Sequence, residues 1–174
     1  MSTPAIEAGI FHRSVVLVLQ HDANGAQGVV INKPLEADVD AVLPGWGGQV
    51  SLPATLFHGG PVNVDSALCL VDLRDRAVPQ GVQRLFDGVG VADLDGDPVG
   101  VGGQVEHIRI FAGYAGWSPG QLEDELRTGS WFLVDAFPDD AFTSAPGGLW
   151  QDVLRRQPGE LSWVALLPED PTVN

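Results

Sequence analysis

The pentapeptide Gly116-Trp117-Ser118-Pro119-Gly120 fits the pattern G-x-S-x-G, which presents a serine nucleophile in many hydrolases. That chemistry requires a strand before the serine and a helix after it. The apolar, β-branched run 108–114 predicts the strand, and residues 119–128 predict the helix. Ser118 therefore occupies the position at which an acyl-transfer nucleophile would lie.

Two features of the same segment argue against a nucleophile. The oxyanion hole of such enzymes uses the backbone N–H of the residue after the serine, and Pro119 has none. Their histidine follows the serine in the chain, whereas the last histidine here is His107. Ser118, Pro119 and Gln121 instead have the order of a helix start, with an N-cap serine, a first-turn proline and a capping-box glutamine. We interpret the segment as a helix cap, and a hydrolase using a pocket near Ser118 or near His21 and His58 is the alternative.

Residues that bind metals or cofactors do not form a recognised pattern. The four histidines have no ligand spacing, and Cys69 is the only cysteine. The acidic stretch 93–98 begins like a calcium loop but has Pro98 where that loop needs glycine. The glycine-rich stretch 100–105 lacks the last glycine of a dinucleotide fingerprint, and we expect a loop there. The sequence predicts no metal and no cofactor.

Length and charge limit the remaining classes. The chain has 174 residues, which suits a single domain spanning 1–174. Nine basic against 23 acidic residues give a net charge of −14, which disfavours direct binding to nucleic acid or to an anionic membrane. Because the chain has a lone cysteine, no signal peptide and no long apolar run, we expect a cytoplasmic protein.

The hydrophobic pattern predicts more strands than helices. Residues 14–20 and 28–32 predict a hairpin with a somewhat long loop, and 149–156 predict a helix with one apolar face. The other predicted strands are 55–58, 67–73, 82–86, 89–93, 131–136 and 161–167, and we expect a short helix at 38–43. Since strands and helices do not alternate, an α+β fold is favoured over a doubly wound sheet.

Four blocks occur in order along the chain: 11–16, then His21 with 25–34, then 59–62, then 113–117 with 120–123. With these blocks the chain resembles the bacterial YqgE/AlgH family from about Thr3 to about Pro168. The stretch 149–158 is similar to the form in actinobacterial members. Members usually carry an apolar strand before the position of Pro4, so we expect either a native start upstream of Met1 or a shortened first strand.

The resemblance implies a single α+β domain in which a twisted, partly barrel-like mixed sheet is flanked by helices. One member's name reflects a proposed role in transcriptional regulation, and the family has no agreed enzymatic activity. The family pattern points to a set of site residues: Arg13, His21, Asn32, Gly59, Gly60, Pro61, Tyr114, Trp117 and Gln121.

The same residues also have structural interpretations, with glycines in turns, Gln121 in the cap and Asn32 as a tie across the hairpin end. Our leading hypothesis is a non-enzymatic binding or regulatory protein, linked at most indirectly to transcription. Arg13, His21, Asn32 and the Gly59-Gly60 backbone would together suit a small anionic ligand, and a protein partner is the other expectation. The sequence does not define the oligomeric state.

Overall fold

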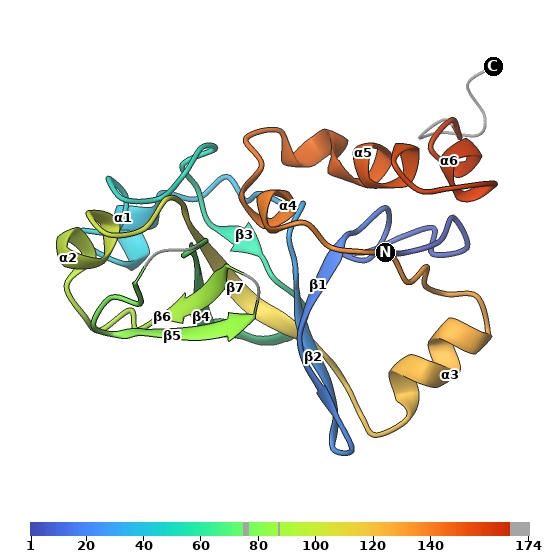
Figure 1. The fold of residues 1–174 in the computed structure, drawn as a ribbon, viewed down its shortest axis with the longest axis horizontal. Helices are drawn as coiled ribbons and strands as arrows, with labels where there is room; N and C mark the ends of the chain where they lie inside the picture. The colour runs from blue at the N-terminus through green and yellow to red at the C-terminus, as the bar shows by residue number, and fades with distance from the viewer. Residues whose placement is uncertain (75–76, 87, 168–174) are drawn as a thin grey trace.

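A curved sheet of seven strands forms the centre of the computed structural model, which describes residues 1–74, 77–86 and 88–167 (Figure 1). The strand order is β1-β2-β7-β4-β6-β5, and β3 pairs with β7 beside this path. The pairs are antiparallel except for β3 with β7. The strands are β1 (Val16–Asp22), β2 (Gly25–Val30), β3 (Phe57–His58), β4 (Val62–Asp72), β5 (Val82–Phe86), β6 (Val89–Ala92) and β7 (Ile108–Trp117).

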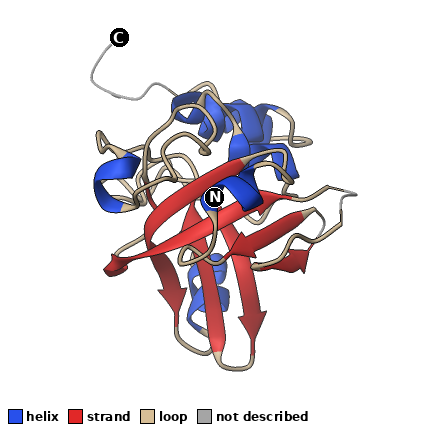
Figure 2. Ribbon diagram, turned by 90° about the vertical axis from the view of Figure 1, so that its left-hand side faces the viewer, coloured by secondary structure: helices blue, strands red, loops and turns tan. Residues whose placement is uncertain are grey.

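Short helices lie around this sheet, with α5 and α6 above it, α1 and α2 at one end and α3 at the other (Figures 1 and 2). The predicted α+β class and the twisted, partly barrel-like sheet are confirmed. No helix in the described part of the chain is long and apolar enough to cross a membrane. The helices are α1 (Val39–Val42), α2 (Pro98–Gly102), α3 (Gln121–Arg127), α4 (Pro138–Phe142), the 3₁₀ turn η1 (Pro146–Gly148), α5 (Leu149–Arg155) and α6 (Leu161–Val164).

Strand β7 joins the two halves of the sheet because its pairing partner changes along its length. Residues 108–112 pair with β4 in continuous register, Tyr114 pairs with Val62 of β4 beyond an irregularity in that register, and residues 115–117 pair with β2. Gly113 lies at this irregularity with φ at 68°, a conformation that glycine adopts without steric cost. The bend at Gly113 therefore lets one strand belong to both halves.

Gly59 and Gly60 pass directly against this bend. The Gly59 N–H donates to the Ala112 carbonyl at 2.8 Å, and the Gly59 carbonyl accepts from the Val30 N–H at 2.8 Å. A Cβ atom on Gly59 would lie 2.2 Å from the Gly113 oxygen, and one on Gly60 would lie 2.1 Å from the Tyr114 carbonyl carbon. Only glycine fits where Gly59 and Gly60 cross the β7 backbone, and this crossing connects β2 to β7.

Apolar side chains pack on both faces of the sheet. One cluster lies beneath α4 and α5 and includes Phe57, Phe111 and Trp150, and another lies toward α1 and α2 and includes Trp46. Arg109 is buried over the Phe57 ring, where its guanidinium donates to the carbonyls of Leu52, Ala141 and Thr143 at 2.8 to 3.0 Å. Burial lowers the pKa of Arg109 to about 10. This arginine fixes the loop at Leu52 and the end of α4 to β7.

Four of the predicted elements differ in the structure. The hairpin loop consists only of Ala23 and Asn24, because the strands extend further toward the tip than their apolar runs. Residues 161–167 begin with helix α6 and not a strand, since this segment packs against α5, away from the edge strands that a new strand would need. In the stretch 131–136, Trp131 alone makes a β-bridge, to Ser2. The expected loop at 100–105 begins within helix α2, whose N-cap Asp97 accepts a hydrogen bond from the Val99 N–H.

Helix α3 begins two residues later than the predicted cap. Its N-cap is Gly120, with φ at 76°, and not Ser118. One of the two hydrogen bonds of the predicted capping box is present nevertheless, because the Gln121 side-chain oxygen accepts from the Ser118 N–H at 3.0 Å. Ser118, Pro119 and Gly120 thus form the turn that leads from β7 into the helix.

The carboxylate of Glu125 anchors α3 to the sheet. It accepts hydrogen bonds from the indole N–H groups of Trp117 at 2.9 Å and Trp131 at 2.6 Å, and from the Gln121 amide at 2.9 Å. Partial burial alone would raise the pKa of Glu125, but the hydrogen bonds from Trp131, Gln121 and Trp117 outweigh it and keep the pKa below 4.5. The two tryptophan rings also contact edge to face at 5.8 Å between centroids.

We predict that Gly59→Ala lowers the free energy of unfolding by about 3 kcal/mol or more, because its new methyl group overlaps the β7 backbone. Gly48→Ala is the control, since nothing lies within 4 Å of a Cβ built there. Urea unfolding measures both. Equal stabilities for the two variants would contradict the role of the crossing.

We also predict a pH-dependent contribution from Glu125. Because its pKa is lower in the folded than in the unfolded chain, it stabilises the fold above its ordinary pKa of 4.5, and this contribution is lost as the pH falls through the folded value. The difference in melting temperature between the wild type and Glu125→Gln should therefore shrink between pH 6 and pH 3. The exposed control Glu36→Gln should melt like the wild type throughout, and a constant Glu125→Gln difference would refute the prediction.

Candidate functional site

The predicted site residues divide between the two ends of the β1–β2 hairpin. Arg13 and Asn32 lie at the end where β1 begins and β2 finishes, and the Asn32 side chain donates to the Arg13 carbonyl at 2.9 Å. His21 pairs with Ala26 near the hairpin tip. From Val16 to His21 the strand covers about 17 Å at 3.3 Å per residue. Arg13 and Asn32 are thus brought together, whereas His21 is separated from them.

Asn32 has the structural role predicted for it. It is buried, and its side-chain oxygen accepts from the Val15 N–H at 2.9 Å while its amide nitrogen donates to Arg13. Both bonds cross the open end of the hairpin. Arg13 itself has φ at 47°, which is uncommon for a residue with a side chain, and the bond from Asn32 helps to hold it there.

A polar cavity of about 250 Å³ lies beside these two residues. The Arg13 guanidinium forms one wall, lies 4.8 Å from the centre of the Trp150 ring and donates to the Leu167 carbonyl at 2.9 Å. Among the described residues, no carboxylate lines the cavity. Its lining residues are His12, Arg13, Asn32, Lys33, Gly147, Trp150 and Gln151.

The sequence did not single out His12 and Lys33 for this cavity. Each is adjacent to a predicted site residue, since His12 precedes Arg13 and Lys33 follows Asn32. That adjacency, together with Lys33 being the only lysine of the chain, is the signal that could have found them.

The glycines of the predicted site have the backbone role described above. The Gly59 N–H is bonded to Ala112, so it is not one of the free N–H groups that the anion hypothesis called for. Pro61 lies further along, on a separate cavity of about 310 Å³ that Trp117 and Gln121 also line. Tyr114 packs against the core beneath this region, and its hydroxyl accepts from the Asn63 amide at 3.4 Å.

The second group surrounds α3 at the hairpin tip. His21 Nε2 lies 2.6 Å from the Glu123 carboxylate, with both side chains about half exposed. The N–H of Glu123 itself, followed by the hydrogen bond from His21, lowers the pKa of Glu123. Trp117 and Gln121 bond to Glu125 as described. These contacts fasten α3 to the sheet and leave His21 engaged with a carboxylate.

The arrangement around Ser118 does not form a nucleophile site. Ser118 is exposed, and among the described residues no hydrogen bond joins its hydroxyl to a histidine. His58 lies in β3 beside Ala112, whereas His21 lies at the hairpin tip, so the two histidines do not share a site.

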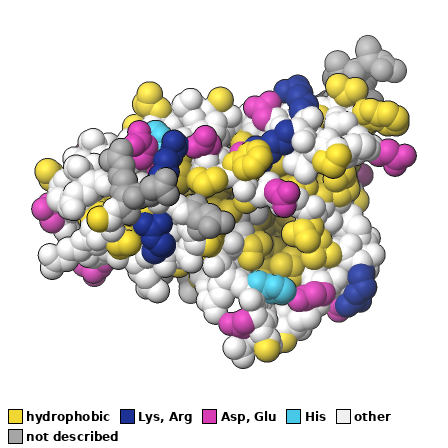
Figure 3. Space-filling model, in the orientation of Figure 1, with side chains coloured by type: hydrophobic (Ala, Val, Ile, Leu, Met, Phe, Trp, Pro, Cys, Tyr) yellow, Lys and Arg dark blue, Asp and Glu magenta, His cyan; other side chains and the backbone are white. Residues whose placement is uncertain are grey.

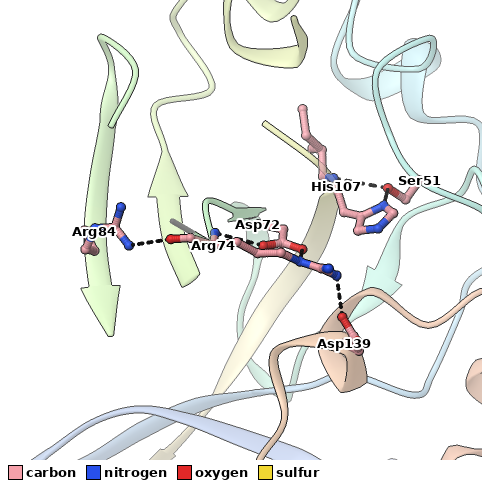
Figure 4. Close-up of polar contacts among 7 residues, drawn as sticks. Ser51, Asp72, Arg74, Arg84, His107 and Asp139 are labelled. Atoms are coloured by element: carbon pink, nitrogen blue, oxygen red, sulfur yellow. Dashed lines mark hydrogen bonds and ion pairs between the residues drawn. The ribbon is translucent and has the colours of Figure 1, made fainter. Parts of the chain in front are cut away.

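A different serine and histidine do meet, near the junction of β4 and β7 (Figure 4). Ser51 Oγ lies 3.1 Å from His107 Nδ1 and also accepts from the Ile108 N–H at 3.2 Å. The His107 ring stacks on Phe142. Within the described ranges no carboxylate bonds the other ring nitrogen, so the orienting third member of a catalytic triad is missing. Nor does any group of three or more His, Cys, Asp or Glu side chains there have the geometry of a metal site.

An ion-pair chain lies beside this serine and histidine (Figure 4). The buried Asp72 accepts from Arg74 Nε at 2.8 Å, and the same guanidinium pairs with Asp139. These ion pairs join the end of β4 to α4. Because the charges are paired within the protein, the ion pairs have a structural role.

Comparison with known proteins agrees with this fold. Residues 1–162 match a family model described as AlgH-like. A UPF0301 protein of Streptomyces avermitilis is 44% identical over 178 residues, covering 100% of this chain and 92% of the relative. One of Mycobacterium avium is 46% identical over 163 residues, covering 92% and 81%.

Two solved structures share the fold. A crystal structure of a protein from Corynebacterium diphtheriae has a TM-score of 0.86 at 32% identity, covering 95% of this chain and 88% of that one. The solution structure of the AlgH protein from Pseudomonas aeruginosa has a TM-score of 0.70 at 25% identity, covering 97% and 91%. Through its sequence, its fold and its actinobacterial relatives, the chain belongs to the AlgH-like family, also named UPF0301.

Proposed function

We propose that this protein is a non-enzymatic binding protein whose pocket at Arg13 and Lys33 takes a small anionic ligand, a carboxylate or a phosphate. The observation that carries the proposal is the concentration of cationic side chains around one cavity in a protein of net charge −14. Only nine basic residues occur in the chain, and two of them line this cavity together with His12. Solubility alone does not explain why basic side chains gather around one cavity, and binding of an anion would explain it.

The geometry of Arg13 favours an anion over a neutral ligand. Its guanidinium is stacked on Trp150 and donates to the Leu167 carbonyl, so less side-chain entropy remains to be lost on binding. A planar guanidinium matches a carboxylate or phosphate through paired N–H groups. Lys33 adds a second charge, and Gln151 adds an amide that can donate or accept.

A regulatory role, if it is exercised, would act through this ligand or through a protein partner and not through DNA. The acidic surface repels a phosphate backbone, and the pocket is too small for a duplex groove. The proposal places the protein in the cytoplasm, where the lone buried Cys69 would stay reduced.

Small anions should stabilise the wild type and do so less in Lys33→Met. A thermal-shift screen would compare inorganic phosphate, acetate, succinate and citrate with sodium chloride at equal ionic strength. An anion at 100 times its dissociation constant should add about 2.7 kcal/mol of stability. In Lys33→Met the apparent affinity should fall at least about tenfold, the loss expected for one charged hydrogen bond.

Arg155→Gln is the matched control, because Arg155 pairs with Asp152 away from the cavity and its loss should leave the shift unchanged. The proposal fails if no anion exceeds sodium chloride, or if Lys33→Met and Arg155→Gln respond alike.

A second prediction addresses the non-enzymatic part of the proposal. A fluorophosphonate probe should label neither Ser118 nor Ser51 in the folded protein, because neither serine has a complete base and orienting group. Mass spectrometry of the treated protein measures this. Labelling that disappears in Ser118→Ala or in Ser51→Ala would instead support a hydrolase.

A further inference from the structure

The cavity beside Pro61 is lined by three aromatic rings, those of Phe11, Trp117 and Trp131, and we call it the aromatic cavity. It measures about 310 Å³. The Trp131 ring lies 5.4 Å from the Phe11 ring and 5.8 Å from the Trp117 ring, at interplanar angles of 82° and 78°. Because rings at nearly right angles form adjoining sides of a box, the cavity has aromatic walls on more than one side.

The carboxylate of Glu125 is the one charged group that lines this cavity in the described part of the chain. Its Oε2 atom accepts from the indole N–H groups of Trp117 and Trp131, and its Oε1 atom accepts from the Gln121 amide. All three donors are neutral. Although partial burial alone would raise the pKa of Glu125, these bonds keep it below 4.5, so the carboxylate is ionised at neutral pH.

The charge of Glu125 has no cationic partner among the described residues. None of the ion pairs there includes Glu125, and no lysine, arginine or histidine lines the aromatic cavity. Glu123 on the same helix pairs with His21, so the two carboxylates differ in this respect. An ionised carboxylate that is held by neutral donors at the edge of a cavity favours a cation in that cavity.

The aromatic walls determine which kind of cation suits the cavity. The face of an aromatic ring attracts a cation within about 6 Å of its centre, tryptophan most strongly, and quaternary ammonium groups are recognised in this way. Their methyl groups pack against the rings, whereas a sodium ion would have to give up bound water. The cavity volume lies near the lower end of the range for small-molecule sites, roughly 300 to 1,000 Å³.

We infer that the aromatic cavity binds a quaternary ammonium group such as that of choline, with its methyl groups against Phe11, Trp117 and Trp131 and its charge beside Glu125. The inference does not rest on the anion pocket, which other residues line. On the face shown in Figure 3, acidic side chains are spread over the surface, so the protein attracts every cation to some extent. The test must therefore separate the cavity from this general attraction.

The test is a titration of the full chain with choline chloride, at an ionic strength kept constant with sodium chloride and followed by the NMR signals of the indole N–H groups. We expect saturable shifts for Trp117 and Trp131, and unchanged signals for Trp46 and Trp150, which lie outside the cavity. The uncharged isostere of choline, in which a carbon atom replaces the nitrogen, should bind at least tenfold more weakly because it fills the same space without the charge.

Gln121→Lys and Gln104→Lys are matched variants, because each adds one positive charge at an exposed position. A lysine at position 121 lies four residues before Glu125 on α3, so its ammonium group can occupy the carboxylate in place of the ligand. Gln121→Lys should therefore weaken choline binding at least tenfold. Gln104→Lys, outside the cavity, should bind like the wild type, and the amide spectra verify that both variants fold.

Phe11→Leu tests the aromatic wall separately, since it keeps an apolar side chain and removes one ring. It should weaken the binding of choline and leave that of the uncharged isostere unchanged. Equal binding of choline and its isostere to the wild type would reduce the cavity to an apolar site and overturn the inference. Absence of saturation at millimolar choline, or an equal response of the two lysine variants, would overturn it as well.

Discussion

The close backbone contact between Gly59-Gly60 and the bend of β7 is the constraint on which the rest of the structure depends. At this point β7 leaves β4 and joins β2, and Gly59 bonds to both β7 and β2. The backbones approach so closely that a single methyl group on Gly59 or Gly60 would overlap main-chain atoms. The curvature of the sheet follows from this contact, and so does the position of the β1–β2 hairpin relative to the other strands.

The candidate binding pocket is a consequence of where the hairpin is held. Its open end is fixed by Asn32, and the cationic pocket forms where that end meets Trp150 and the start of α5. Helix α3, which Glu125 ties to Trp117 and Trp131, packs near the other end of the hairpin. A few hydrogen bonds thus fix both ends of the hairpin.

The sequence predicted secondary structure correctly where a residue pattern is compatible with only one type of element. The apolar, β-branched runs within β1, β4 and β7 were correctly predicted as strands, and the Asn32 tie follows from an amide at a hairpin end. The run 161–167 has two solutions, because a short apolar stretch can form a helix or a strand, and packing on α5 decided it. The stretch 131–136 was also ambiguous, since it has the composition of a strand but forms a β-bridge only at Trp131.

The sequence could not show which site residues lie close together in space, because the tertiary structure decides this. Arg13 and His21 are close in sequence, but a strand separates them by its length, so they cannot share a ligand of small size. Lys33 and Trp150 are far apart in sequence and meet only because the fold places α5 over the hairpin end. Ser51 and His107 are likewise joined by tertiary structure alone.

The most direct test of the central claim is a titration of the full chain with the best-binding small anion, followed through the NMR signals of the backbone and of the arginine side chains. The account predicts saturable shifts confined to residues 12–13, 32–33 and 147–151, with the Arg13 guanidinium among them. Shifts that rise linearly without saturation, or that are largest at exposed arginines such as Arg127, would contradict a specific anion site.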